Sequence, residues 1–372
     1  MGEKLEIMNL QMFINSSLKH NRSSQNYPNG DFYNVFEEVE YPYYGNYLAQ
    51  YRDAYNAIHG YLSLAFCIFG ITANLLNIIV LTRRNMISPT NAILIGLAVS
   101  DILVMSSYIP FTYHHYIRTG LTEEEKFSYD WAIFTLFHQH FTIVSHTIST
   151  WLTVTVAIWR FLAVRFPSHA GVWCSMYRAK VAILATYIVC PIFGLPGYLT
   201  STIKEDHEGN TVLYLIFFSN ISQRHNKLIQ KITFWISSVI MKLVPCVALT
   251  GISVGLIKVL YERKLLRQRL RADVDRNHDR TTRMLLVVLM LFLITEFPSG
   301  LLALLSGILG TDFFNHVYTN FGETMDALAL VNNAINFIIY CTMSQLFRNT
   351  FANLFLPSFF KTPSTIVSAS TV

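Results

Sequence analysis

Seven long apolar segments run along the 372-residue chain, separated by shorter polar stretches. A helix of about 20 apolar residues spans the roughly 30 Å hydrocarbon core of a bilayer. The pattern predicts membrane helices at residues 58–81, 91–113, 132–160, 179–200, 232–260, 283–309 and 324–343. The expected fold is therefore an all-α membrane protein, with a seven-transmembrane helix bundle at residues 57–343.

The segments on either side of the bundle have different patterns. Residues 1–56 are polar, aromatic and acidic, which predicts a flexible extracellular tail. They lack the basic start and apolar run of a cleaved signal peptide, so none is expected. Residues 344–355 place Phe347, Phe351 and Leu354 on one helical face. This spacing predicts a short amphipathic helix 8 lying on the inner leaflet.

Serine and threonine are frequent in residues 356–372, the expected cytoplasmic tail. Their phosphorylation would create an anionic stretch suited to arrestin. The chain ends at Val372 after a serine and a threonine, which fits a ligand of a PDZ protein, although so short a match also arises by chance.

Positive charge indicates which loops face the cytoplasm, because such loops carry an excess of Lys and Arg. Arg83 and Arg84 follow the first span. A larger group follows the fifth span and comprises Arg263, Lys264, Arg267, Arg269, Arg271, Arg276 and Arg280. Three Asn-x-Ser glycosylation acceptors, Asn15, Asn21 and Asn220, fall on the opposite side. We therefore expect a multi-pass protein of the plasma membrane with an extracellular N terminus and a cytoplasmic C terminus.

The composition agrees with a bilayer environment. The chain is 52% hydrophobic and 14% charged, which is more apolar than the core of a soluble domain requires. The formal charge of +5 does not indicate a nucleic-acid partner, because the basic residues gather on inner loops that face anionic membrane lipid and a cytosolic partner. Acidic residues on the outer loops, such as Glu123 and Glu124, would concentrate a cationic ligand or simply solvate the loop.

Polar residues recur at helical spacing within two of the predicted spans. In the third span they are His138, Thr142, Ser145, Ser149, Thr153 and Arg160, and in the seventh they are Glu323, Asp326, Asn333, Asn336 and Tyr340. A charged group at bilayer depth costs about 2.5–3.5 kcal/mol on insertion scales. Each stripe is therefore expected to face the interior of the bundle, where its side chains can find partners.

A carboxylate, Asp101, falls within the second span. The residues expected to gather around it are Asn74, Ser149, Asn332, Asn333 and Asn336. Such an oxygen-rich set suits Na⁺, acting as an allosteric ion, or a cluster of bound water. A hydrogen-bonded network without an ion explains the same residues equally well. No other metal and no cofactor is expected.

Sequence landmarks on most of the spans occur in a recognisable order. They are Asn74, Leu97-Ala98-Val99-Ser100-Asp101, Arg160, Pro245, Pro298 and Asn336-Phe337-Ile338-Ile339-Tyr340. Together they resemble the landmarks of rhodopsin-like (class A) G-protein-coupled receptors. The resemblance implies that a heterotrimeric G protein is the partner. It also implies that activation involves Arg160, Trp159, Tyr340, Asn336, Pro298 and Pro245.

Three departures from the usual landmarks narrow the choice of receptor subgroup. Trp159 stands where an acid usually precedes the arginine of the third helix, Glu296 replaces the usual Trp of the sixth, and Phe337 replaces the usual Pro of the seventh. The combination resembles invertebrate myosuppressin and FMRFamide-like peptide receptors, which are relatives of the sex peptide receptor. It implies a secreted amidated neuropeptide ending in Arg-Phe-amide as agonist, with Gi/o favoured as the G protein.

The implied ligand needs partners for both of its terminal residues. A guanidinium prefers a carboxylate in bidentate geometry, and Asp326 and Glu296 are favoured over Glu323 for this role. The aromatic slot for the Phe residue could be formed by Phe137, Phe141, Phe234, Trp235 and Tyr318.

Other polar residues of the bundle complete the predicted ligand site. His138 and Thr142 join it from the third span. Lys242 joins it from the fifth span, and because an unpaired buried ammonium is costly, we predict an ion pair between Lys242 and Glu296.

Cysteine positions exclude one common covalent link. The five cysteines are Cys67, Cys174, Cys190, Cys246 and Cys341. None lies near Thr135, at the outer end of the third span, or in the loop at 201–230, so the usual disulfide between these regions cannot form. The loop is either held by packing or more mobile than usual.

Other classes fit the sequence less well. A biogenic amine receptor would need an acid near Thr142, and a retinal protein would need a lysine within 324–343. A channel or transporter would show inverted repeats or a filter loop. An enzyme is not expected, because His138 and His140 point apart on a helix and no nucleophile or phosphate loop is present. A different peptide or a small-molecule ligand stays open as an alternative.

Overall fold

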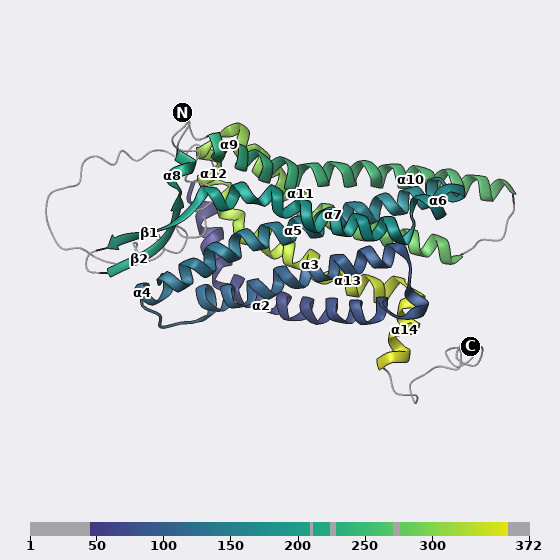
Figure 1. Cartoon of the computed structure of the whole chain (residues 1–372), viewed down its shortest axis with the longest axis horizontal. Helices are drawn as coiled ribbons and strands as arrows, with labels where there is room; N and C mark the ends of the chain where they lie inside the picture. Colours follow the sequence, from purple (N-terminus) through teal and green to yellow (C-terminus); the bar gives the residue numbers. More distant parts are fainter. Residues whose placement is uncertain (1–44, 209–210, 224–227, 271–275, 356–372) are drawn as a thin grey trace.

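The computed structural model describes residues 45–208, 211–223, 228–270 and 276–355, which form a long helical bundle with one β-hairpin. The long helices are α2 (Gly45–Leu81), α3 (Pro89–Thr112), α5 (Tyr129–Arg165), α7 (Met176–Thr200), α10 (Val244–Leu270), α11 (Arg276–Leu309) and α13 (Gly322–Met343). Before α10, α9 (Leu228–Trp235) and the π-helix η4 (Ile236–Leu243) complete the fifth segment. Figure 1 shows these helices lying along one common direction.

Short elements connect the long helices at the two ends of the bundle. They are η1 (Arg84–Met86), η2 (Tyr113–Ile117), α4 (Glu123–Lys126), α6 (Pro167–Trp173), β1 (Ser201–Glu208), β2 (Thr211–Phe218), α8 (Asn220–Gln223), α12 (Thr311–His316) and η5 (Tyr318–Phe321). Figure 1 places the hairpin with α4, α8 and α12 at one end, and α6 with α14 (Gln345–Phe355) at the other.

Within the described residues, six helical segments are long and apolar enough to cross a membrane. They are Leu48–Leu81, Pro89–Ile117, Tyr129–Arg165, Met176–Thr200, Lys231–Arg263 and Phe313–Thr342. The remaining long helix, α11, contributes a shorter described apolar stretch, Leu293–Leu309. These helices agree with the predicted spans and make the chain a multi-pass membrane protein.

Local sequence explains where the second and fourth membrane helices begin. Ser88 is extended and its hydroxyl accepts a hydrogen bond from the backbone N–H of Asn91 at 3.1 Å, while Pro89 occupies the first helical position, where its missing N–H costs nothing. Ser175 caps α7 in the same way, accepting from the backbone N–H of Arg178 at 3.4 Å. Both starts follow capping signals that the sequence itself carries.

The first helix begins earlier than predicted. α2 starts at Gly45, so residues 45–56 belong to the helix and not to a flexible tail. Tyr51 explains the extension, because its ring packs against Phe321 at 5.4 Å and its hydroxyl lies 2.7 Å from the Thr324 hydroxyl. The predicted tail before residue 45, with Asn15 and Asn21, lies outside the described residues, as does the predicted tail at 356–372.

The β-hairpin is the main element that the sequence pattern did not predict. β1 and β2 pair antiparallel from Ser201 opposite Phe218 to Glu208 opposite Thr211. All five cysteines are free, so the predicted absence of a disulfide is confirmed. Leu213 and Leu215 pack with Phe127 in a buried cluster, to which the Tyr214 N–H adds a 2.9 Å hydrogen bond to the Phe127 carbonyl. Packing therefore holds this loop in place of the disulfide.

The predicted short helix after the seventh span is present as α14, and one of its predicted apolar residues, Phe347, is buried in the bundle. In α14, Phe347 is fully buried against Tyr340 and Phe337 and does not face a leaflet. Arg348 strengthens this junction by donating to the carbonyl oxygens of Cys341 at 3.2 Å and Thr342 at 2.9 Å, at the end of α13. α14 is therefore anchored to the bundle by a buried aromatic contact.

Candidate functional site

A cavity of about 610 Å³ lies between α3, α5, α11, α13 and η4 in the hairpin half of the bundle. Ile216 and Phe218 of β2 line it from the hairpin side. The structure brings all of the predicted ligand-binding residues to this one cavity, namely Asp326, Glu296, Glu323, His138, Thr142, Lys242 and Trp235. The helical spacing of polar residues therefore identified part of its walls.

Two carboxylates occupy the first turns of α13. Glu323 is 8% exposed and Asp326 lies one turn further along the same helix. The Tyr108 hydroxyl of α3 donates to Oδ2 of Asp326 at 3.3 Å. The N-terminal end of a helix carries a partial positive charge that favours nearby carboxylates. This end of the cavity therefore presents an anionic surface to a cation.

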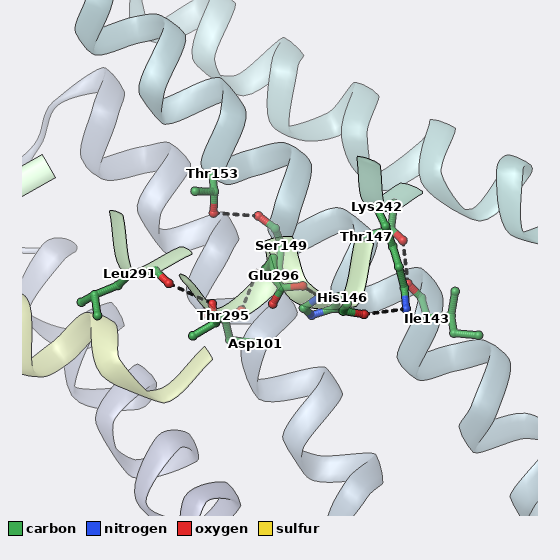
Figure 2. A network of polar contacts seen from close by, with 11 residues as sticks. Asp101, Ile143, His146, Thr147, Ser149, Thr153, Lys242, Leu291, Thr295 and Glu296 are labelled. Carbon is green, nitrogen blue, oxygen red and sulfur yellow. Dashed lines mark hydrogen bonds and ion pairs between the residues drawn. The ribbon is translucent and has the colours of Figure 1, made fainter. Parts of the chain in front are cut away.

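A second polar group lies deeper in the cavity and joins α5, α11 and η4. His146 Nε2 contacts Glu296 Oε2 at 3.0 Å, and Lys242 Nζ donates to the Ser299 hydroxyl at 3.1 Å. Figure 2 shows the Glu296 carboxylate directed toward His146, within the network that Lys242 joins from η4. Residue His146 was absent from the predicted site, yet it is the direct partner of Glu296.

The predicted direct ion pair between Lys242 and Glu296 is not formed. Lys242 interacts with Glu296 only over a longer distance, and it also interacts with Tyr318 and Asp326. The prediction was wrong because sequence reasoning paired two charges by depth alone. The rotation of α5 places His146 beside the Glu296 carboxylate, and Lys242 instead donates to the hydroxyl of Ser299.

His138 and Thr142 line the cavity as part of a small hydroxyl–imidazole cluster. His138 Nδ1 lies 3.2 Å from the Ser107 hydroxyl and 3.3 Å from that of Thr142. Phe111 stacks on the imidazole ring at 4.4 Å. The cluster ties α3 to α5 and fixes the side wall of the cavity.

The predicted aromatic slot is only partly correct. Phe234, Trp235 and Tyr318 line the cavity, but Phe137 and Phe141 do not. Phe137 is 48% exposed and stacks on Phe141 at 5.0 Å, on a different face of α5 from His138. Their one-turn spacing keeps these two rings together but turned away from the cavity.

Asp101 is fully buried within a polar network that joins α3, α5 and α13. The Ser149 hydroxyl donates to its Oδ1 at 2.6 Å, and Nδ2 of Asn336 donates to its Oδ2 at 3.3 Å. Both side-chain groups of Asn333 are buried without a described partner. The oxygen-rich residues suit the predicted Na⁺ chemically, while the two donated hydrogen bonds already satisfy Asp101 without an ion.

Two residues predicted to surround Asp101 form no described hydrogen bond to it. Asn74 donates from Nδ2 to the backbone carbonyls of Asn333 at 2.8 Å and Gly70 at 3.0 Å, so it joins α2 to α13. Asn332 is partly exposed and forms none of the described hydrogen bonds of this network.

Comparison with known proteins agrees with this arrangement of helices, cavity and buried polar network. Residues 61–357 match the family model described as serpentine type 7TM GPCR chemoreceptor Srw. The chain belongs to this G-protein-coupled receptor family. It is therefore a signalling receptor and not an enzyme.

Three individual relatives show which receptors the chain is similar to. The receptor is 31% identical to the G-protein coupled receptor dmsr-1 of Caenorhabditis elegans, over 82% of this chain and 69% of that protein. It is 27% identical to the sex peptide receptor of Drosophila melanogaster, over 80% and 72% of the two chains. It is 23% identical to the FMRFamide receptor of the same fly, over 86% and 61%. The resemblance stated from the sequence is thereby confirmed.

Arg160 and Tyr340, two of the residues predicted to act in activation, lie toward the end of the bundle where α6 and α14 are found. Tyr340 is buried, and it interacts electrostatically with Arg160. Among the residues whose side chains the structure describes, no carboxylate lies within ion-pair distance of Arg160, as expected with Trp159 in place of an acid. Nε of Arg160 and Nε1 of Trp159 are both buried without a described partner.

Two prolines shape the fifth and sixth helices of the receptor. Pro298 lies inside α11, where it removes one backbone hydrogen bond. Pro245 is the second residue of α10, which begins directly after the π-helical segment η4. A π-helical segment widens the turn and is often found at functional sites. Lys242 and Met241 of η4 both line the cavity, so this local change of winding helps to shape it.

Tyr108 and His146 are the clearest residues that sequence reasoning missed. His146 lies one turn after Thr142, so extending the polar stripe by four residues would have found it. Tyr108 carries no comparable signal, because a tyrosine in an apolar helix is more often part of the packed core.

Proposed function

We propose that this receptor lies in the plasma membrane, with its N terminus outside, and is activated by a secreted peptide ending in Arg-Phe-amide. A pair of carboxylates, Glu323 and Asp326, supports this proposal, because both line one cavity together with the aromatic side chains of Phe234, Trp235 and Tyr318. Relatives that are named as sex peptide and FMRFamide receptors support a peptide ligand.

The guanidinium is assigned to Glu323 and Asp326. The sequence favoured Asp326 with Glu296, but one oxygen of Glu296 is already occupied by His146. Glu323 lies one turn from Asp326 on the same helix, and the two carboxylates can therefore share one guanidinium through charge-assisted hydrogen bonds. The ring of the terminal Phe residue fits the surface formed by Phe234, Trp235 and Tyr318.

Signal transfer is assigned to the cytoplasmic half. The bend at Pro298 lets the inner part of α11 swing outward. Arg160 and Tyr340 would then line the opening that receives the C-terminal helix of a G protein, for which Gi/o is proposed. Arrestin binding to the phosphorylated tail and PDZ binding at Val372 complete the proposed cytoplasmic partners, and Na⁺ at Asp101 is the proposed allosteric ion.

A paired change in receptor and peptide tests the assignment of the guanidinium. Glu323→Gln and Asp326→Asn are each compared with the unchanged receptor, using a peptide with Arg and a peptide in which citrulline replaces this Arg. Charge-assisted bonds of this kind contribute about 1.5–3 kcal/mol, so each variant is expected to lower the potency of the Arg peptide by roughly 10- to 150-fold.

The citrulline peptide has no charge to lose, so both variants are expected to change its potency much less. Tyr108→Phe, which removes only the hydroxyl that donates to Asp326, is the matched control and is expected to have a small effect. Equal losses for the Arg and citrulline peptides would contradict the assignment.

A further inference from the structure

One oxygen atom in the cavity is buried without a partner. Glu296 is 7% exposed and lines the cavity, and its Oε2 is bound to His146 Nε2 at 3.0 Å. Its Oε1 is buried and has no described hydrogen-bond partner. A buried carboxylate oxygen left unpaired is costly, so this atom marks a place where a hydrogen-bond donor is needed.

A donor lies in the same polar group. The Lys242 ammonium has three N–H groups; one is donated to the Ser299 hydroxyl at 3.1 Å and a second is shared with the Tyr318 side chain, which leaves one for a ligand. Lys242 lines the cavity together with Glu296 and interacts with it electrostatically. The deep part of the cavity therefore offers one acceptor that needs an N–H and one cation that can donate to a carbonyl.

We propose that Glu296 and Lys242 recognise the C-terminal carboxamide of the peptide, with Glu296 Oε1 accepting from its NH₂ group and Lys242 Nζ donating to its carbonyl oxygen. This inference rests on the proposed function. A primary carboxamide is the terminal group that combines a donor and an acceptor on one carbon. A free carboxylate offers no N–H and places a negative charge beside Glu296.

His146 acts as a positioning residue in this arrangement. Its bond to Oε2 fixes the orientation of the Glu296 carboxylate and leaves Oε1 for the ligand. His146 also interacts electrostatically with Asp101, which is bonded to Ser149 and Asn336. Binding of the carboxamide to Oε1 would therefore change the electrostatic interactions of the polar network that connects α3, α5 and α13.

The first test varies the end of the peptide on the unchanged receptor. Four forms of one activating peptide are compared: the primary amide, the N-methylamide, the N,N-dimethylamide and the free acid. A site that hydrogen-bonds a ligand group rejects an analogue lacking that group strongly, by about 100-fold or more. The dimethylamide is uncharged but has no N–H, so it is expected to be as weak as the acid, while the N-methylamide keeps intermediate potency.

The second test changes the acceptor in the receptor. Glu296→Gln replaces an oxygen that only accepts with an amide that can also donate, so the potency ratio of primary amide to free acid is expected to fall at least tenfold. Lys242→Gln removes the cation that would attract a carboxylate, so the same ratio is expected to stay or rise. Glu323→Gln is the control, because it weakens amide and acid alike and leaves the ratio unchanged.

The outcomes separate this inference from the proposed function. If no amidated peptide activates the unchanged receptor, the proposed function fails. If amides activate it but the dimethylamide is as potent as the primary amide, Glu296 does not accept a hydrogen bond from the carboxamide N–H. The same conclusion follows if the Glu296→Gln receptor, verified at the cell surface, keeps the full potency ratio of primary amide to free acid. The peptide series alone decides if that variant does not reach the surface.

Discussion

The pair formed by His146 and Glu296 predicts a specific loss of stability. His146→Leu removes the only described direct partner of the Glu296 carboxylate, whose other oxygen already lacks one. Removing one partner of a buried ion pair costs about 3–5 kcal/mol. Because Lys242 also interacts with Glu296 over a longer distance, we expect a value near the lower limit, about 3 kcal/mol.

Thermal unfolding of the purified receptor in detergent measures this loss. An unfolding entropy of about 2.1 cal/mol/K per residue gives about 0.8 kcal/mol/K for the 372 residues, so a loss of about 3 kcal/mol predicts a Tm decrease of roughly 4 °C for His146→Leu. His207→Leu makes the same chemical change at an exposed position of β1 and is expected to leave the Tm unchanged. The comparison separates the loss of the pair from a general effect of replacing a histidine.

A double variant completes the test. Glu296→Gln removes the charge that His146→Leu leaves unpaired, so the two changes together are expected to cost less than the sum of the single changes. A His146→Leu receptor that melts within about 2 °C of the unchanged receptor would refute the reasoning. Losses that simply add would show that the two side chains do not depend on each other.

Three other features give direct predictions. Leu213→Ala leaves a cavity in the hairpin cluster and is expected to speed amide hydrogen exchange in the hairpin, whereas Asp206→Ala, at an exposed position, is not. Equal exchange rates in the two variants would show that packing of Leu213 does not stabilise this loop. Phe347→Ala should cost about 3–5 kcal/mol and reduce surface expression, with exposed Leu346→Ala as control, and similar effects of both would show that α14 is not anchored there. If Na⁺ binds at Asp101, replacing choline by Na⁺ should lower agonist affinity in the unchanged receptor but not in Asp101→Asn, and a response kept by that variant would place the ion elsewhere.

The spans and the walls of the cavity could be predicted because both depend on local periodicity. A run of apolar residues long enough to cross a bilayer identifies a helix, and steps of three and four identify its interior face. That is why Glu323 and Asp326 on α13 and His138 on α5 were correctly placed together in advance of any structure. A separate observation, the absence of cysteine near Thr135 and in residues 201–230, excluded the usual disulfide from the sequence alone.

The contacts between helices could not be predicted, because they depend on how each helix is rotated against its neighbours. Depth in the membrane put Lys242 and Glu296 at a similar level, but rotation selected His146 as the partner. Phe137 was assigned to the cavity, and its position one residue from His138 turns it away. The hairpin depends on Phe127, which lies far from it in sequence.

Activation of Gi/o in cells that express the receptor tests the central claim most directly. A peptide ending in Arg-Phe-amide is compared with the same peptide as a free acid and with a citrulline-Phe-amide peptide, after surface expression has been verified. We expect a response to the Arg-Phe-amide peptide, with both other peptides at least about tenfold weaker. Equal responses to all three, or silence across a panel of amidated Arg-Phe peptides, would contradict the claim.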